Sequence, residues 1–203
     1  MTHTQKKSLP ESPSQTAGPY LHIGCTPNAV GLDGVYAVDP GSGSIETVSS
    51  SESIVLSGCV FDGQGERVRD CMVEIWQADA AGRYCDNEQS MPESFGAWRR
   101  SMVDFETGEF CFTTIKPGSV AYDREQQQAP HISLWLVARG INVGLHTRVY
   151  FDDEPEANAS DPILVLIEPR ERVATLLARK MTEREYRFEI HLQGDRETVF
   201  FDA

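Results

Sequence analysis

The residues best suited to chemistry lie at the start of one apolar strand. His131 and Ser133 are separated by a single residue, and side chains at that spacing on a strand point to the same face. Two imidazoles in such an arrangement often bind a metal ion together. Here the second position is serine, and a lone imidazole does not make a structured metal site. We therefore expect His131 to be a hydrogen-bonded structural histidine.

The segment Thr16-Ala17-Gly18-Pro19-Tyr20 is a second candidate binding element. Gly18 and Pro19 predict a turn in which a ligand can approach the backbone closely. Tyr20 adds an aromatic ring with a polar tip, which suits the wall of a pocket. An ordinary turn with a core tyrosine is the alternative interpretation.

These candidates must be positioned by a fold made mostly of strands. Alternating apolar residues and frequent turns predict strands at 54–61, 68–78, 109–115, 131–138, 147–151, 163–167, 186–193 and 198–201. The spacing of Val173, Leu176 and Leu177 predicts one short C-terminal helix, Glu171 to Met181. Residues 53–203 are therefore expected to form an all-β, antiparallel β-sandwich. Residues 1–52 are expected to form an N-terminal arm, flexible over 1–15, and a loop-rich segment that contacts a partner.

Composition excludes several classes of function. The 203 residues carry a formal net charge of -13, which argues against a nucleic-acid partner because phosphate binding needs a basic face. The apolar runs are too short to cross a membrane, and the polar N-terminus lacks the apolar core of a signal peptide. Five cysteines without metal-type spacing are expected to be reduced thiols, which indicates a cytoplasmic protein.

Several sequence blocks in a fixed order identify a family. They include Ser57-Gly58-Cys59-Val60-Phe61-Asp62-Gly63, Val73-Glu74-Ile75-Trp76-Gln77-Ala78-Asp79, Gly82-Arg83-Tyr84, Thr114-Ile115-Lys116-Pro117-Gly118, Ala129-Pro130-His131-Ile132, Val149-Tyr150-Phe151-Asp152-Asp153 and Glu197-Thr198-Val199-Phe200-Phe201-Asp202. From about residue 12 to 203 the chain thereby resembles the intradiol ring-cleaving dioxygenases. The resemblance implies a β-sandwich that, in catalytic members, holds Fe(III) on two tyrosines and two histidines. Phenolate and imidazole are donors that suit ferric iron.

This chain departs from the ligand set that the resemblance implies. Catalytic members have His-x-His where this chain has His131 and Ser133, and Tyr where it has Val120. A further Tyr is absent between Cys85 and Ala97, and Gln128 stands where those members have Arg. His131 is thus the single retained ligand position, and we expect no metal and no catalytic residue in this chain.

Within the family the chain is similar to the α subunits of two-chain enzymes that cleave protocatechuate with O2 to 3-carboxy-cis,cis-muconate. The resemblance implies that a β subunit holds the Fe(III) and that αβ pairs assemble into a higher hetero-oligomer. It also implies that Thr16, Gly18, Pro19 and Tyr20 line the substrate pocket beside that iron. Arg139 would lie near the substrate carboxylate, whose charge a guanidinium can balance.

Three alternatives remain at this point. Arg139 could instead form a salt bridge at the end of its strand. The chain could be a catalytically inert pseudoenzyme that acts as a structural or partner-binding module. It could also be an independent dioxygenase with His131, Tyr84 and Tyr122 as a shifted ligand set.

Overall fold

The computed structural model describes residues 16–18, 20–42, 53–84, 97–142 and 144–202. The expected flexible arm, residues 1–15, lies outside this part, as does Pro19. The helical elements are α1 (Leu21–Cys25), η1 (Asn28–Val30), α2 (Pro155–Ser160), η2 (Leu164–Leu166) and η3 (Arg170–Leu176). The strands are β1 (Ser53–Phe61), β2 (Met72–Gln77), β3 (Trp98–Met102), β4 (Glu109–Ile115), β5 (Val120–Ala121), β6 (Gln127–Gln128), β7 (His131–Val137), β8 (Leu145–Phe151), β9 (Leu177–Lys180) and β10 (Glu185–His191). Among the described helices, none is both long and apolar enough to span a bilayer.

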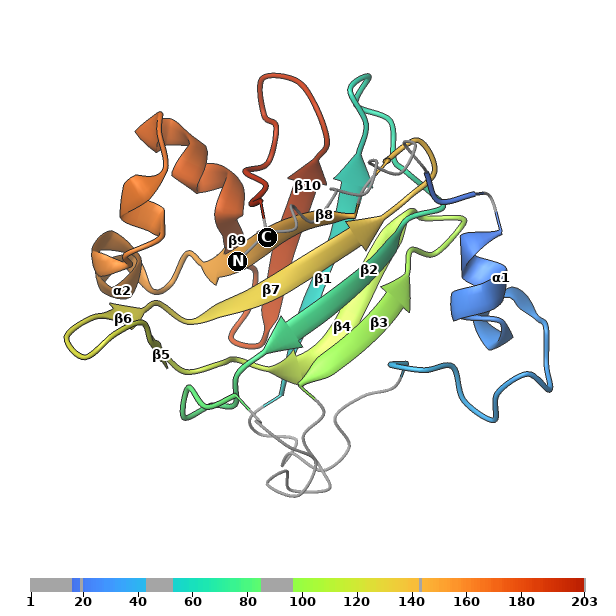
Figure 1. Cartoon of the computed structure of the whole chain (residues 1–203), viewed down its shortest axis with the longest axis horizontal. Helices are drawn as coiled ribbons and strands as arrows, with labels where there is room; N and C mark the ends of the chain where they lie inside the picture. The colour runs from blue at the N-terminus through green and yellow to red at the C-terminus, as the bar shows by residue number, and fades with distance from the viewer. Residues whose placement is uncertain (1–15, 19, 43–52, 85–96, 143, 203) are drawn as a thin grey trace, which may run out of the picture.

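Eight strands form one sheet that folds over on itself. Their order is β3-β2-β7-β8-β9-β10-β1-β4, and β5 pairs with β6 separately. In Figure 1 the strands β7, β2 and β3 lie in front of β10, β1 and β4. The all-β sandwich is thus confirmed, and most of its strand pairs are antiparallel as expected, with two exceptions. β1 pairs with β10 in parallel, and so does β8 with β9.

The main core lies between the two halves of this sheet. β1 and β10 contribute Leu56 and Phe188 from one half, while β7 contributes Ile132, Leu134 and Leu136 from the other. All five are at most 1% exposed. The alternation of β7 therefore turns its even-numbered residues into the core and leaves His131, Ser133 and Trp135 on the outer face.

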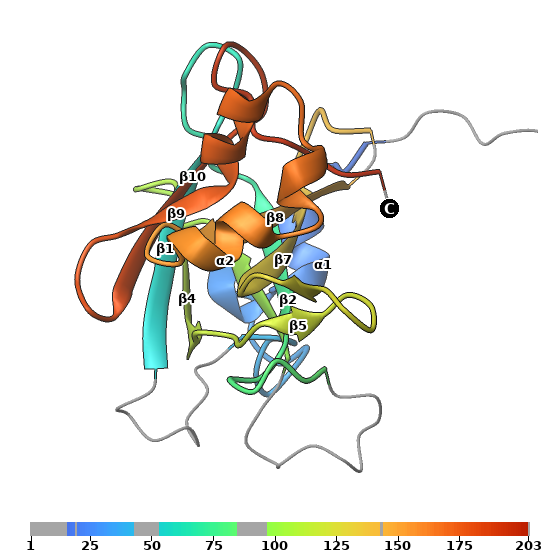
Figure 2. The same ribbon diagram turned by 90° about the vertical axis from the view of Figure 1, so that its left-hand side faces the viewer.

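A second apolar cluster covers part of that outer face. It comprises Ala129, Tyr150, Leu164, Ile167, Leu176 and Val199. Ala129 comes from the entry to β7, Tyr150 from β8, the next three from η2, η3 and the connection between them, and Val199 from the segment after β10. Figures 1 and 2 show α2 and the neighbouring helical turns on the opposite side of the molecule from α1. The cluster buries the first residues of β7 from outside as well as from within.

The C-terminal third differs most from the sequence-based expectation. The predicted helix Glu171 to Met181 is wrong, because η3 ends at Leu176 and Leu177–Lys180 is strand β9. A 3-10 turn also places residues three apart on one side, so the spacing of Val173 and Leu176 fits both helix types. β9 pairs with β8 on one side and β10 on the other, and this long-range pairing overrides the local pattern.

Two predicted strands in this region are also wrong. Residues 163–167 contain the 3-10 turn η2, which starts where Asp161 Oδ1 accepts hydrogen bonds from the backbone N–H groups of Ile163 and Leu164, both at 2.8 Å. Residues 198–201 form a single bridge, between Phe201 and His146, instead of a strand. Leu164 and Ile167 of the first run and Val199 of the second pack in the second cluster instead of extending the sheet.

Residues 20–42 form a loop-rich layer beside β3. Asp39 accepts hydrogen bonds from the backbone N–H groups of Asn28 and Ala29 at 3.0 and 2.9 Å. Arg100 of β3 donates to the carbonyl of Cys25 at 3.2 Å and pairs with Glu74 at 2.6 Å. These contacts fix the loop segment to the edge of the sheet.

Candidate functional site

His131 lies at the entry of β7 in buried surroundings. The residue is 1% exposed, and its Nδ1 is 2.8 Å from the carbonyl oxygen of Ala129. Burial lowers the pKa of His131 to about 4, so the ring is neutral at pH 7 and its Nδ1–H donates to that carbonyl. These are the surroundings of a structural histidine.

Ser133 lies on the same outer face as His131, as the sequence predicts. Tyr84 forms a hydrogen bond with Ser133, and burial raises the pKa of this tyrosine. The Tyr84 ring stacks on Trp76 with ring centroids 6.2 Å apart. In the register of β7 and β8, Ser133 stands opposite Arg148, and His131 stands opposite Tyr150.

Arg148 is the cation of this cluster. Its Nη1 donates to Gln128 Oε1 at 2.7 Å and to the Tyr150 hydroxyl at 3.3 Å. The guanidinium also lies over the ring of Phe201, 5.7 Å from the centroid. Its positive charge contributes to the low pKa of His131. Arg148 thus stands beside the positions where the family's ligand pattern would put metal donors.

Asp161 holds the residues around His131 in place through its carboxylate. It is fully buried, and its Oδ2 accepts a hydrogen bond from the backbone N–H of Ala129 at 2.8 Å. Its Oδ1 lies 3.5 Å from the Tyr150 hydroxyl. Burial raises the pKa of Tyr150 to about 12, which keeps its phenol protonated at pH 7.

These residues do not fit a ferric ion. Ser133 replaces an imidazole, and the guanidinium of Arg148 would repel a trivalent cation beside His131. Across the described ranges, no group of three His, Cys, Asp or Glu side chains could hold a metal ion. Tyr122 is 49% exposed, in the turn between β5 and β6. Of the shifted ligand set, Tyr84 forms a hydrogen bond with Ser133 and Tyr122 faces solvent.

A second candidate site lies at the other end of β7. Ala17 forms a parallel β-bridge with Arg139, and the backbone N–H of Gly140 donates to Thr16 Oγ1 at 2.9 Å. Gly140 has φ of 88°, a conformation that favours glycine. The structure therefore brings together Thr16 and Arg139, which are more than a hundred residues apart in sequence.

Arg139 forms an ion pair with Asp70, in which Nε and Oδ2 are 3.1 Å apart. The arginine side chain is nevertheless 65% exposed. It lines a surface cavity of about 470 Å³ together with Asp62, Arg67, Val68, Arg69, Asp70, Phe105 and Leu192. The strand-end salt bridge that the sequence left open is thus present, and the guanidinium is still accessible from solvent.

The remaining predicted pocket residues are less closely gathered. Gly18 has open space where a side chain would begin. Tyr20 is 73% exposed, and its backbone carbonyl begins α1 by accepting a hydrogen bond from Ile23 at 3.1 Å. The Tyr20 ring thus contributes to an outer surface of this chain and not to a closed pocket within it.

Sequence reasoning missed Asp70, Arg148 and Asp161. Asp70 follows Arg67-Val68-Arg69 in the connection to β2, and nothing local links it to Arg139. Alternation along β8 could have identified Arg148, because a charged residue between the buried Thr147 and Val149 must face away from the core. Asp161 precedes Pro162 and could have been read as a capping residue.

Comparisons with known proteins agree on one family. The dioxygenase family model matches residues 44–194. The α chain of protocatechuate 3,4-dioxygenase from Pseudomonas putida is 45% identical over 96% of this chain and 97% of its own length. The β chain of that enzyme from Burkholderia cepacia is 34% identical over 70% of this chain and 65% of its own length. The dioxygenase domain of a carbohydrate-binding fusion protein from Streptomyces sp. SirexAA-E is similar in structure, with a TM-score of 0.53, 25% identity, and coverage of 81% of this chain and 92% of that domain. The chain belongs to the intradiol dioxygenase family.

Proposed function

We propose that this chain is the non-iron α subunit of an αβ enzyme that cleaves protocatechuate with O2 to 3-carboxy-cis,cis-muconate. The β subunit holds the Fe(III) in this proposal, and several αβ pairs form the complete enzyme. The observation that carries the proposal is the pairing of the Thr16 segment with the strand end at Arg139. That pairing creates a surface element with a cation and an open backbone turn, which suits an aromatic carboxylate.

The arrangement at Arg139 suits recognition more than ring chemistry. Asp70 holds the guanidinium through one side, and the exposed remainder can accept a second carboxylate. Thr16 fixes the neighbouring Gly140 backbone, so the arginine is presented from a defined strand end. Thr16, Gly18, Pro19, Tyr20 and Arg139 therefore bind and orient the substrate in the proposal, while the iron of the partner supplies activation of the catecholate toward O2.

The exposed side of the N-terminal layer supports a partner chain. Large apolar side chains that face solvent here are Tyr20, Ile23, Leu32, Val35, Tyr36 and Val38. Apolar surface gathered in one segment is typical of an interface with another protein. We infer that residues 1–52 form an N-terminal arm and partner-contacting segment and that residues 53–203 form the sandwich domain. The four described cysteines are free thiols, which is consistent with a cytoplasmic enzyme.

The test uses the reconstituted αβ complex. Arg139→Ala should raise KM for protocatechuate about tenfold or more, because a charge-assisted hydrogen bond to the substrate is lost. Tyr20→Phe should have a smaller effect, and iron per αβ pair should stay unchanged in both variants. Asp70→Asn is the matched control, since it frees Arg139 and should not raise KM.

Two outcomes would contradict the proposal. Unchanged KM and kcat in both variants would remove the pocket role and favour the inert structural module, for which the Arg139–Asp70 pair is the supporting observation. Near one iron per chain in the protein purified without a β subunit would overturn the assignment of iron to the partner.

A further inference from the structure

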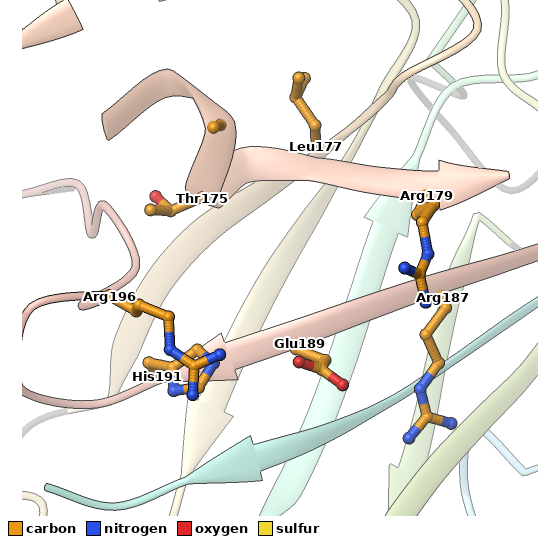
Figure 3. A pocket seen from close by; sticks show the side chains of 8 residues that line it. Thr175, Leu177, Arg179, Arg187, Glu189, His191 and Arg196 are labelled. Atoms are coloured by element: carbon orange, nitrogen blue, oxygen red, sulfur yellow. The ribbon is translucent and has the colours of Figure 1, made fainter. Parts of the chain in front are cut away.

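A cationic pocket lies on the outer face of β9 and β10, and its lining contains none of the residues of the two candidate sites described above. Its volume is about 380 Å³, and it is lined by Ala174, Thr175, Leu177, Arg179, Arg187, Glu189, His191 and Arg196. Figure 3 shows Arg196 beside His191 at one end, and Arg179 and Arg187 at the other. Three arginines and one glutamate give this pocket a positive charge in a chain whose net charge is -13.

At the end of the pocket formed by Arg179 and Arg187, two arginines lie directly opposite each other. Arg187 and Arg179 are register partners in the antiparallel pair of β10 and β9. Like charges directly opposite each other on a sheet destabilise it unless an anion balances them. Glu109 balances Arg187 through an ion pair of 2.7 Å. In the described ranges, Arg179 forms no ion pair with any carboxylate.

At the opposite end of the pocket, the cation Arg196 lies next to the flat ring of His191. Arg196 also lacks an ion-pair partner within the part of the chain that the structure describes. His191 stacks on Phe61, with ring centroids 4.9 Å apart and planes 13° apart. Burial, followed by the charge of Arg196, lowers the pKa of His191 and favours its neutral form. Arg196 is therefore the main cation at this end.

The rest of the lining decides what kind of anion fits. Glu189 lies between the two ends (Figure 3), so a ligand must reach past it instead of placing charge at the centre. Ala174 and Leu177 supply apolar wall, which inorganic phosphate would leave unused. A pocket of this volume is in the range for small organic ligands. The two separated cations match two carboxylates on one carbon skeleton.

We propose that this pocket binds a small organic anion with two or more carboxylates, at a site separate from the substrate pocket. Arg179 binds one carboxylate and Arg196 binds another, while Ala174 and Leu177 contact the carbon skeleton between them. Ring opening of protocatechuate yields a tricarboxylate from a monocarboxylate, so the proposed function, on which this source of the ligand alone rests, would supply an anion of this class. The positive charge of the pocket is independent of that function.

The experiment is calorimetric titration of the full chain with tricarballylate at fixed ionic strength. Arg179→Ala and Arg196→Ala should each weaken binding about tenfold or more, since each removes a charge-assisted contact. Glu189→Gln should tighten binding, because it removes a negative charge from the lining that the structure describes. Arg124→Ala, which removes an exposed arginine outside this pocket, is the matched control and should leave binding unchanged.

The same titration with benzoate and with inorganic phosphate tests the ligand class, and both should bind at least tenfold more weakly. Equal binding of phosphate would overturn the organic assignment. No saturable binding of tricarballylate, or equal weakening by Arg124→Ala, would overturn the site itself. Repetition with the αβ complex tests access: binding should persist, and loss of binding there would show that the partner's side chains occupy the pocket instead of a free ligand. None of these readouts depends on turnover, so they can fail while the proposed function stands.

Discussion

Two outer faces of the same sheet carry arginines in opposite situations. On β8, the ring of Phe201 from the chain after β10 packs on Arg148, and neutral acceptors on Gln128 and Tyr150 bind it. On β9, Arg179 lies on an open face opposite Arg187. In both places strand alternation alone directs the arginine outward. The difference between them comes from what packs on top.

The comparison separates a charge that serves structure from a charge that is available to a ligand. Arg148 is surrounded by hydrogen-bond acceptors and an aromatic ring, so its removal would leave buried groups without partners. Arg179 has no carboxylate partner in the described ranges, so its removal takes away only charge. What packs on each arginine therefore distinguishes the family's ligand position beside His131 from the pocket at Arg179.

The largest loss of stability is expected from a variant that weakens the second apolar cluster, which covers β7 and β8. Asp161→Ala removes the acceptor of three backbone N–H groups, those of Ala129, Ile163 and Leu164. Buried donors without partners are costly, so we expect a loss of about 4 kcal/mol in the free energy of unfolding. Urea denaturation followed by circular dichroism measures it.

A matched control for this variant is Asp123→Ala. Asp123 accepts hydrogen bonds from the backbone N–H groups of Glu125 and Gln126 at 2.8 Å but is exposed to water. Water can replace it, so the unfolding midpoint should barely move. Similar losses in the two variants would show that the cover over β7 and β8 contributes no special stability.

The next effect depends on pH and concerns His131. Its folded pKa of about 4 lies below the model-peptide value of 6.5, so between these pH values the unfolded chain binds a proton that the native state does not. Stability should therefore fall as pH decreases from about 6.5 to about 4, by about 3 kcal/mol from this group. His131→Asn keeps a donor for the Ala129 carbonyl and should remove this part of the pH dependence.

His191 on the open face should respond to pH less than His131 does. Burial also lowers its pKa, but its ring borders the cationic pocket, which is open to solvent. His191→Asn should change the pH dependence less than His131→Asn does. Unfolding midpoints at pH 7 and pH 4.5 for the wild type and both variants measure this, and equal slopes in the two variants would contradict the distinction between the faces.

The smallest effects come from the arginines themselves. Arg148→Ala should cost about 2 kcal/mol, because Gln128 and Tyr150 lose a charged donor in a partly buried setting. Arg179→Ala should change the free energy of unfolding by no more than about 0.5 kcal/mol. Any change should be stabilising, because the repulsion with Arg187 is removed. Thermal unfolding of the two variants side by side measures the difference. Equal destabilisation would mean that Arg179 has a structural partner as well.

Local patterns predicted much of the sheet and part of the candidate sites. Strands β1, β4, β7 and β10 follow from alternation and turn residues, since period-two burial is visible in the sequence alone. The same-face placement of His131 and Ser133 follows from the same rule. The 3-10 turn η3 could not be separated from an α-helix, because both place Val173 and Leu176 on one side.

Residue types and short spacings are enough to specify an all-β core and a family membership. Tertiary structure is needed to pair Asp70 with Arg139, to place Arg148 beside His131 and to set Arg179 opposite Arg187. Each of these contacts joins separate elements through sheet register and the closure of the two halves by β9. Sequence distance carries no information about such register, since it is set by the packing of the whole core.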